Sequence, residues 1–456
     1  MSEKFSSPVS IDNIYQLDGR VPFGKAIPFG LQHVLAMFVS NLAPITIIAG
    51  AAQLSGEQTG MLLQNAMFVA GITTLIQLYP IVLPGTGLRI GARLPIVMGV
   101  SFTFVTILCS IAVNYGYPGV IGAVLVGGIM EGTLGLFARY LAKFIKPIVS
   151  ASVVTAIGMS LFTVGARSFG GGYAEDFGSA ANLTIGVFTL VVCLVWAAVT
   201  KGYMKQLSVL AGLVAGYILS IFMGRVDLSG ILSGGAVSFP HFMMFKPEFH
   251  LGAILSVCII FLVSAAETIG DTSAMTMGGL GRPITDQEVS GSLACDGFAS
   301  AFSSLFGCSP VTSFSQNVGL IAMTKVVNRF TIMTGALCMV LGGLIPVVGN
   351  FFASLPQAVL GGCTIMLFGQ ILLSGMQMIA HCGFTQRNMT IASLSLAVGV
   401  GFTASTASTE IGIWQIFPQL IKDVFGANVV AVVFVVAMIL SYVLPENMEI
   451  QKDGNL

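Results

Sequence analysis

Charged residues are scarce in this chain. Only 8% of its 456 residues are Asp, Glu, Lys or Arg, and 19 basic residues are balanced by 19 acidic ones. A net charge of zero leaves no excess of Lys and Arg for phosphate groups, so neither a nucleic-acid nor an acidic partner is indicated. The useful information lies in where the charges stand along the chain.

Paired cysteines and metal-binding motifs are also missing. The eight cysteines occur singly in apolar stretches, with no CxxC pair and no cluster near the four histidines. We expect them to be small core residues rather than disulfides or metal ligands. No HExxH motif is present, and Thr268 replaces the first glycine of the GxGD element that Ile269 to Asp271 partly match. The chain is therefore predicted to be neither an enzyme nor a protein with a cofactor.

Apolar residues are what the chain has in abundance. Hydrophobic residues make up 55% of it, and its mean hydropathy is +0.92. One soluble core cannot bury so much apolar chain, whereas a bilayer absorbs it in spans of about 20 residues. We predict an all-α polytopic membrane protein with fourteen transmembrane segments. They begin near Ile27, Met61, Pro95, Val120, Pro147, Leu183, Leu207, Leu251, Val289, Pro310, Phe330, Pro356, Ile391 and Ala427.

The basic residues give the predicted orientation. With fourteen segments and both termini in the cytoplasm, fifteen of the nineteen Lys and Arg fall on the inner side. The outer side keeps Arg167, Arg225, Lys246 and Lys422. Positive residues concentrate on cytoplasmic loops, so this asymmetry supports the count and the orientation. Residues 1–26 lack an apolar core and are predicted to form a cytoplasmic N-tail, with residues 446–456 as the cytoplasmic C-tail.

Two short apolar segments are interrupted by Pro or Gly at matching places in the chain. They are PIVMGVSFTFV, from Pro95 to Val105, and the segment from Pro310 to Thr324, and each is the third of its half. Seven segments per half give the halves opposite topology, so we predict a 7+7 inverted repeat with segments 3 and 10 discontinuous. Irregular backbone at membrane depth survives only inside protein or around a cavity. A midplane binding site is expected there; the alternative is two unrelated proline kinks.

Acidic residues stand within apolar sequence. Glu267 ends a long apolar run, and Asp271 follows one helical turn later on the same face. Two neighbouring carboxyl groups oppose each other's ionisation, which suits a proton carrier, although Asp271 is alternatively a helix cap near Arg282. Asp296 lies among small residues that permit close helix approach, and its role is open between structure and coupling. Glu131 is either another interior acid or a helix-end residue.

One histidine stands inside a strong apolar span. His33 follows Gln32 in the sequence PFGLQHVLAMF of the first segment. A lone buried histidine is ordinarily a structural group, and the alternative is that it orients Asp296 or Gln316.

An amide pair marks the place where the second interrupted segment re-enters a helix. Gln316 and Asn317 stand there, beside backbone NH groups that a helix start leaves free. A glutamine amide adds a donor and an acceptor, which match the edge of a flat heterocycle bearing NH and C=O groups. Glu267 would accept from the ligand's NH groups, and Phe102 or Phe314 would stack on its face.

These residues resemble the nucleobase-ascorbate transporter family. Its signature runs Gln, Glu or Pro, then Asn, any residue, Gly, four more residues, Thr, and often Lys, Arg or Gly, and QNVGLIAMTK from Gln316 to Lys325 is similar to it. GLQHVLAMF, VSFTFV around Phe102, ETIGD from Glu267 and CDG around Asp296 resemble further family elements. The resemblance covers essentially the whole chain and points to the bacterial xanthine and uric acid permease branch.

The resemblance implies roles for individual residues. Substrate-binding groups are implied at Glu267, Gln316, Phe102, Phe314 and Ser315, the last three through the backbone that lines the pocket. A polar network linked to protonation is implied at Asp271, Asp296 and His33, with Asn317 supporting the signature helix.

The resemblance also implies two domains and a mechanism. Segments 1–4 (27–138) and 8–11 (250–350) would form a core, and segments 5–7 (147–225) and 12–14 (356–445) a gate that also makes a homodimer contact. Family members move the core against the gate like an elevator. A proton drives uptake in bacteria, and sodium drives it in the mammalian ascorbate branch.

The predicted function is proton-coupled uptake of xanthine or uric acid across the bacterial inner membrane. Gln316 and Asp271 resemble the purine branch, because uracil carriers usually have Glu and His at these positions. Lys325 and Ser101 depart from the bacterial xanthine pattern and leave the preferred purine open, with uracil or another nucleobase as the alternative. An anion transporter of the sulfate-permease type resembles the same 7+7 plan, but it needs positive charge at the broken helices, where this chain has acids.

Overall fold

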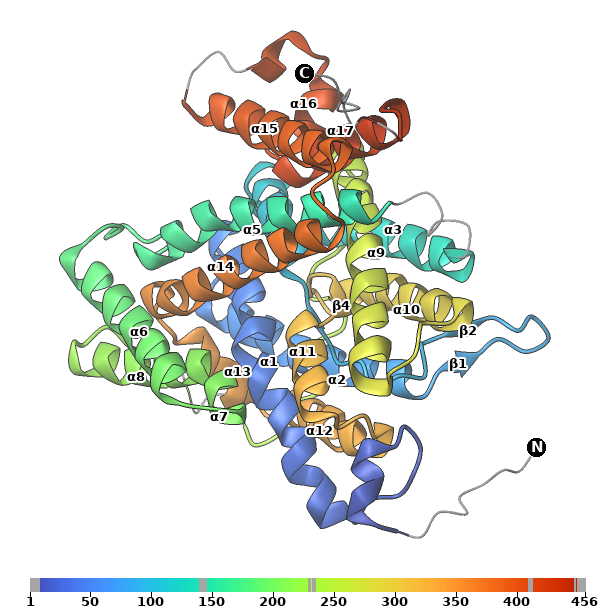
Figure 1. The fold of residues 1–456 in the computed structure, drawn as a ribbon. Coiled ribbons are helices and arrows are strands. Elements are labelled where there is room, and N and C mark those ends of the chain that lie inside the picture. The colour runs from blue at the N-terminus through green and yellow to red at the C-terminus, as the bar shows by residue number, and fades with distance from the viewer. Residues whose placement is uncertain are drawn as a thin grey trace, which may run out of the picture.

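The chain folds into helices for most of its length (Figure 1). A computed structural model describes residues 9–138, 146–228, 231, 235–408, 413–446 and 448, so parts of both predicted tails lie outside the described residues. The first half contains α1 (Phe23–Ala51), α2 (Gly56–Leu78), α3 (Val105–Leu136), α5 (Pro147–Phe169), α6 (Ala180–Val199), α7 (Tyr203–Gln206) and α8 (Ser208–Phe222). The second half contains α9 (Leu251–Met275), α10 (Asp286–Leu305), α11 (Ser315–Thr324), α12 (Arg329–Gly342), α13 (Pro346–Ala353), α14 (Gln357–His381), α15 (Gln386–Ser408), α16 (Gln419–Phe425) and α17 (Val429–Val443).

Short elements join these helices. The 3-10 turns are η1 (Ile11–Tyr15), η2 (Phe102–Phe104) and η4 (Ile413–Ile416), and a π-helical turn, η3 (Thr276–Leu280), extends α9. Four strands complete the described chain: β1 (Ile81–Val82), β2 (Arg89–Ile90), β3 (Met98–Val100) and β4 (Val311–Ser313).

The prediction of a helical membrane protein is confirmed. Among the described residues, eight helices are long and apolar enough to cross a membrane, and the number is ten if each of two bent pairs is one span. The bent pairs are α12 with α13, at 79°, and α16 with α17, at 98°. The remaining apolar pieces are too short to span alone, so the count of fourteen segments stays a prediction.

Gly116 divides α3 into two parts. Gly116 has φ 73° and ψ 174°, outside helical geometry, and Pro118 follows it. A residue with a side chain rarely adopts such a positive φ, whereas glycine does so at little cost. The chain therefore turns at this point, and the two parts of α3 correspond to the separately predicted segments that begin at Pro95 and Val120.

The two interrupted segments meet as a pair of strands. β3 and β4 pair antiparallel, with Gly99 opposite Thr312, although more than two hundred residues separate them in sequence. Backbone bonds extend the ladder at both ends: Ser101 N donates to the Pro310 carbonyl at 3.0 Å, and Phe314 N donates to the Val97 carbonyl at 3.0 Å. This pairing satisfies the backbone that leaves helical geometry, as membrane depth requires.

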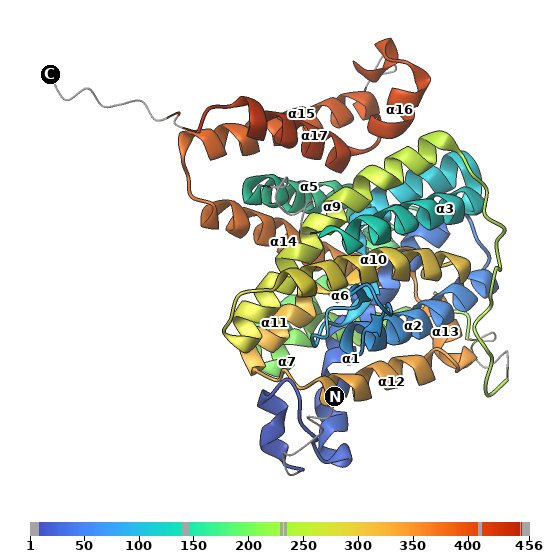
Figure 2. The ribbon, with the colours of Figure 1, turned by 90° about the vertical axis from the view of Figure 1, so that its right-hand side faces the viewer.

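The helices pack in two groups around these strands. α3 packs against α9 and α10, and α12 packs against α1 and α2. In the other group α5 lies along α14, with Gly158 against Leu372 and Gly375 against Thr155. Figures 1 and 2 both show α15 and α17 side by side beyond α5, at the end farthest from the N-terminus. Small residues at the helix contacts allow this close approach.

The predicted N-tail is partly structured. Residues of η1 and the turn after it lie against the start of α12, where Asn328 Nδ2 donates to the carbonyls of Gln16 and Gly19, both at 3.0 Å. Val327 N also donates to the Ile14 carbonyl at 3.0 Å. The tail thus contacts the connection between α11, which carries Gln316, and the start of α12.

Candidate functional site

Two acids of α9 contact both interrupted segments. Glu267 Oε2 accepts a 2.7 Å hydrogen bond from Thr103 Oγ1 in η2, directly after β3. One turn further, Asp271 Oδ2 accepts from Ser315 Oγ at 2.8 Å and from Ser313 Oγ at 3.0 Å, at the end of β4 and the start of α11. The predicted helical spacing therefore places each carboxyl group beside a different segment of the strand pair.

A third acid, Asp296 of α10, contacts the β3–β4 strand pair through Ser313. Asp296 of α10 is fully buried, and its Oδ2 accepts from Thr268 Oγ1 of α9 and from Ser313 N at 3.3 Å. Ser313 thus contacts Asp296 through its backbone and Asp271 through its hydroxyl. Asp296 thus pairs with a backbone NH of the second interrupted segment and with a hydroxyl of α9.

The amide pair at the start of α11 binds to α1. Gln316 Oε1 accepts a 3.1 Å hydrogen bond from Ser40 Oγ. Asn317 Nδ2 donates to the backbone carbonyl of His33 at 3.1 Å and lies 3.2 Å from its Nδ1. His33 is buried, and its partner is Asn317 rather than Asp296 or Gln316, the two residues named as alternatives from the sequence. Its contact fixes α11 against α1.

Gln316 lines a cavity of about 280 Å³. Lys205, Ser208 and Gln370 supply polar groups to the same cavity, and Glu267 is not among its lining residues. Glu267 and Gln316 therefore do not line this cavity together, and each has a hydroxyl partner of its own, Thr103 for Glu267 and Ser40 for Gln316. Neither Lys205 nor Gln370 stood out in the sequence, because Lys205 lies in the short helix α7 and Gln370 is a single amide within the apolar helix α14.

The two phenylalanines have different surroundings. Phe102 is partly exposed and makes an edge contact with Phe368 of α14, with ring centroids 5.2 Å apart. Phe314 is 7% exposed, and a Cβ on Gly99 would come within 2.8 Å of its ring. The ring of Phe314 is thus packed in the interior, whereas Phe102 joins the strand pair to α14.

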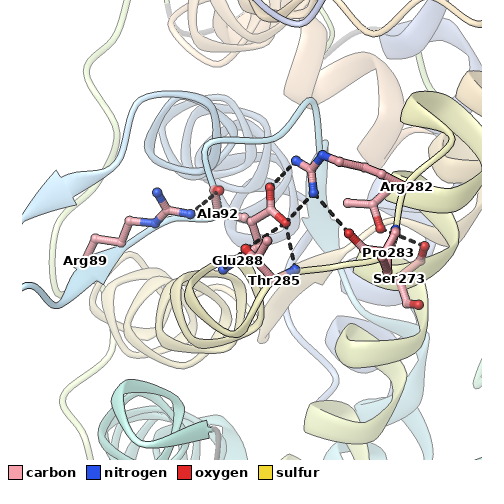
Figure 3. A network of polar contacts seen from close by, with 8 residues as sticks. Arg89, Ala92, Ser273, Arg282, Pro283, Thr285 and Glu288 are labelled. Atoms are coloured by element: carbon pink, nitrogen blue, oxygen red, sulfur yellow. Dashed lines mark hydrogen bonds and ion pairs between the residues drawn. The ribbon is translucent and has the colours of Figure 1, made fainter.

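The loop after α9 is held by an ion pair (Figure 3). Arg282 donates to both carboxylate oxygens of Glu288, at 2.5 and 2.9 Å, and Glu288 also accepts from Thr285 N at 3.0 Å. Arg282 therefore has Glu288 as its acidic partner, and the alternative in which Asp271 caps the helix near Arg282 is wrong. Arg89 Nη2 donates to the Ala92 carbonyl at 2.8 Å on the adjoining segment.

Hydroxyl and amide residues that the sequence did not single out complete the site. Gln77 Nε2 donates to Ser292 Oγ at 3.1 Å, and Thr272 Oγ1 donates to the same oxygen at 2.9 Å. With Thr103 and Thr268 they link α2, α9 and α10 around the acids. The only signal in the sequence was the high content of Ser and Thr in apolar segments, which indicates hydrogen bonding inside a bundle without naming partners.

The polar groups of this site are suited to binding a ligand through hydrogen bonds. Carboxylates accept hydrogen bonds, and a glutamine amide both donates and accepts, so the set suits a ligand with NH and C=O groups. Over the ranges that the structure describes, no group of three or more His, Cys, Asp or Glu side chains is placed to hold a metal ion.

The sequence is similar to that of known permeases. A family model described as the permease family matches residues 24–408. Xanthine permease XanQ of Escherichia coli K12 is 32% identical over 95% of this chain and 94% of its own length. Uric acid permease PucJ of Bacillus subtilis is 33% identical over 87% of this chain and 88% of its own length. A putative purine permease of Clostridium perfringens, CPE0397, is 32% identical over 96% and 94%.

Solved structures share the fold at low sequence identity. The transmembrane domain of the cyanobacterial bicarbonate transporter BicA has a TM-score of 0.56 and 15% identity, with 92% of this chain and 98% of that domain covered. Murine Slc26a9, an anion transporter in the inward-facing state, has a TM-score of 0.61 and 10% identity, with 94% and 70% covered. These likenesses concern the arrangement of helices alone.

Proposed function

Because the chain belongs to the nucleobase-ascorbate transporter family, we propose that it takes up a purine nucleobase, xanthine or uric acid, together with a proton. Members of this permease family are membrane transporters and not enzymes, and this chain is a polytopic membrane transporter of nucleobases. The bacterial relatives support placement in the inner membrane, and the distribution of Lys and Arg supports the proposal that both termini are cytoplasmic.

The observation that carries the proposal is the contact of both α9 acids with the strand pair. Glu267 reaches Thr103 after β3, and Asp271 reaches Ser313 and Ser315 around β4. Acids of α9 that lie beside the ends of the interrupted segments are placed to accept hydrogen bonds from a ligand's NH groups and to bind protons. Interrupted segments at matching positions in two halves are typical of the substrate site of secondary transporters.

In the proposed binding mode, Glu267 and Gln316 recognise opposite edges of the base. Glu267 accepts from NH groups, and Gln316 donates to and accepts from the other edge. The backbone of Phe102, Phe314 and Ser315 lines the pocket between them. Asp271, Asp296, His33 and Asn317 form the polar network behind these groups, an assignment supported by the hydrogen bonds that join them to β4, α9 and α1.

The proposed architecture has fourteen segments in two inverted repeats, with β3 and β4 opening the third and the tenth. The core comprises residues 27–138 and 250–350, and the gate comprises 147–225 and 356–445. Close packing of α5 on α14 supports the gate as one body, and the β3–β4 pair supports the core as another. The core moves against the gate like an elevator, and two copies associate through their gates.

Transport assays with competing bases test this proposal. Vesicles that contain the protein should accumulate labelled xanthine or uric acid, with competition by the other purine and little competition by uracil. A protonophore should abolish accumulation, and replacing sodium by potassium should not change it. Preferential uptake of uracil would support the alternative, a uracil transporter of the same family. Transport of small inorganic anions without any purine uptake would refute the proposal.

A further inference from the structure

A second cavity, of about 340 Å³, lies between the proposed core and the proposed gate. Its walls come from α3 and the end of α1 on one side, and from α5, the loop after it and the start of α14 on the other. Arg167 alone of its described lining residues carries a charge. Uncharged polar groups are supplied by Thr106, Ser110, Asn114, Thr163, Ser168 and Gln357.

The cavity faces the outside in the proposed orientation. α1 follows the cytoplasmic N-tail, so Ile47, near the end of this helix, is close to the outer surface. Gln357 starts α14 at the same level, where its Nε2 donates to the Thr46 carbonyl at 3.4 Å. Arg167 is one of the four basic residues that the charge distribution places outside. A substrate that is taken up therefore arrives on this side.

The inner end of the cavity lies beside the proposed substrate pocket. Thr106, which lines the cavity, follows Phe102 by about one helical turn. Val164, another lining residue, precedes Gly165, and a Cβ there would come within 3.0 Å of the ring of Phe368. Phe368 in turn contacts Phe102, with ring centroids 5.2 Å apart. The cavity thus leads from the outer surface to the edge of that pocket.

Three consecutive glycines after α5 fold the chain back over Arg167. Gly171 has φ 114° and Gly172 has φ 77°, values that glycine adopts at little cost. Gly172 N donates to the Arg167 carbonyl at 2.9 Å, and the next residue, Tyr173, places its ring 4.6 Å from the guanidinium carbon. Stacking occupies the face of the guanidinium, whereas its N–H donors point outward in its plane. The glycine turn therefore orients Arg167.

The charge of Arg167 is available to a ligand. None of the ion pairs in the described part of the chain involves Arg167, whereas Arg225 pairs with Asp176 at 2.8 Å. Both Arg167 and the ring of Tyr173 are exposed. A guanidinium presents a planar fork of donors that matches negatively charged oxygens, and the surrounding hydroxyl and amide groups both donate and accept hydrogen bonds. The set suits a small planar anion with C=O and NH groups.

We propose that this cavity, the outer antechamber, is a second purine-binding site in which Arg167 binds the anionic form of the base, urate above all, before the base reaches Glu267. The inference rests on the proposed uptake of xanthine or uric acid. Urate is an anion at neutral pH, and the acids beside the central pocket oppose a second negative charge. An arginine at the outer end of the path supplies the attraction that these acids do not, and it raises the local concentration of the anion.

Arg167→Gln tests the assignment through the difference between two substrates. At slightly acidic pH urate is an anion and xanthine is neutral. Arg167→Gln should then raise the KM for urate uptake roughly tenfold, the lower end of the effect of losing a hydrogen bond to a charged group, because the site is open to solvent. The kcat for urate and both constants for xanthine should stay as in wild type, which also shows that the variant folds.

Two further variants separate the guanidinium from charge in general. Arg167→Lys should recover only part of the urate KM, since an ammonium group lacks the planar fork. Lys246→Gln removes an exposed basic residue of the predicted outer side that does not line the cavity, and it should behave as wild type. An unchanged urate KM in Arg167→Gln, or an equal rise for urate and xanthine, overturns the proposal.

Equilibrium dialysis with labelled urate gives a readout that needs no transport. Purified Glu267→Gln, in which recognition in the central pocket is expected to be lost, should still bind urate, and Glu267→Gln combined with Arg167→Gln should bind none. Equal binding by the two proteins, or displacement of urate by inorganic phosphate as effective as by unlabelled urate, overturns the antechamber. If the wild type transports neither xanthine nor uric acid, the proposed function fails, and the dialysis result alone then decides this site.

Discussion

The hydroxyl of Thr103 donates a 2.7 Å hydrogen bond to Oε2 of Glu267. These residues are 164 positions apart in sequence, and the bond joins the segment after β3 to α9. On the other side of the strand pair, Ser313 and Ser315 make the equivalent contact with Asp271. Each interrupted segment is thus attached by a hydroxyl to one acid of the same helix.

Glu267→Gln should abolish concentrative uptake of xanthine or uric acid. The substitution keeps the side-chain volume but replaces an acceptor oxygen by an NH2 group, which would face the ligand's own NH groups. Uptake by membrane vesicles measures the effect, and immunoblotting checks that the variant reaches the membrane. Retained concentrative uptake would show that Glu267 does not recognise the ligand.

Thr103→Val should weaken binding of the base, because Glu267 loses a donor that fixes its orientation. A hydrogen bond to a charged group is worth about 1.5–3 kcal/mol, which corresponds to roughly 10- to 150-fold in affinity. Thr103→Ser keeps the hydroxyl and serves as the matched control, with affinity close to wild type. Calorimetric titration with xanthine checks both variants, and equal affinities for Val and Ser would contradict the role of this hydroxyl.

Gln316→Ala should reduce affinity for the purine by about 1–2 kcal/mol, since it removes one neutral donor and acceptor from the proposed edge contact. Part of any loss could come from the broken contact with Ser40, so Ser40→Ala separates the two causes. Ser40→Ala should keep most of the affinity. Competition of unlabelled xanthine with labelled substrate measures the affinity of each variant. An inhibition constant for Gln316→Ala equal to that of wild type would exclude Gln316 from recognition of the base.

Gly99→Ala should destabilise the protein by about 1–3 kcal/mol, the usual cost of overpacking an interior. The new Cβ would lie 2.7 Å from Cε of Met37 and 2.8 Å from the ring of Phe314. Gly401→Ala, where nothing lies within 4 Å, is the control. Thermal unfolding in detergent should show a lower Tm for Gly99→Ala alone, and equal Tm values would mean that the strand crossing tolerates the added methyl group.

Arg282→Ala should lower the Tm, because Glu288 is mostly buried and loses two charge-assisted hydrogen bonds. The expected cost is about 1.5–3 kcal/mol. Arg282→Lys should recover only part of it, since an ammonium group cannot reproduce the two-pronged contact of a guanidinium. If the melting curve of Arg282→Ala is identical to that of wild type, the hydrogen bond from Thr285 N to Glu288 holds this loop without the arginine.

The sequence identified the important acids but not their partners. Glu267 and Asp271 could be recognised because carboxyl groups are rare and costly within apolar helices, and their spacing of four fixes a shared face. Thr103, Ser313 and Ser40 could not be recognised, because hydroxyl residues occur throughout apolar helices and satisfy their own backbone there. Only the crossing of β3 and β4 selects which of them bind the acids.

The sequence by itself determined the class of protein: apolar runs specify helices that a bilayer accepts, and local composition decides this without reference to the rest of the chain. Pro and Gly in the sequence did not by themselves decide where helices end, since Pro28 and Pro44 lie within the continuous helix α1. The tertiary structure decided the pairing of β3 with β4, the partner of His33 and the burial of Glu131 between α9 and α10. These contacts join residues far apart in the chain, and their free energy depends on how whole helices pack, which no local pattern contains.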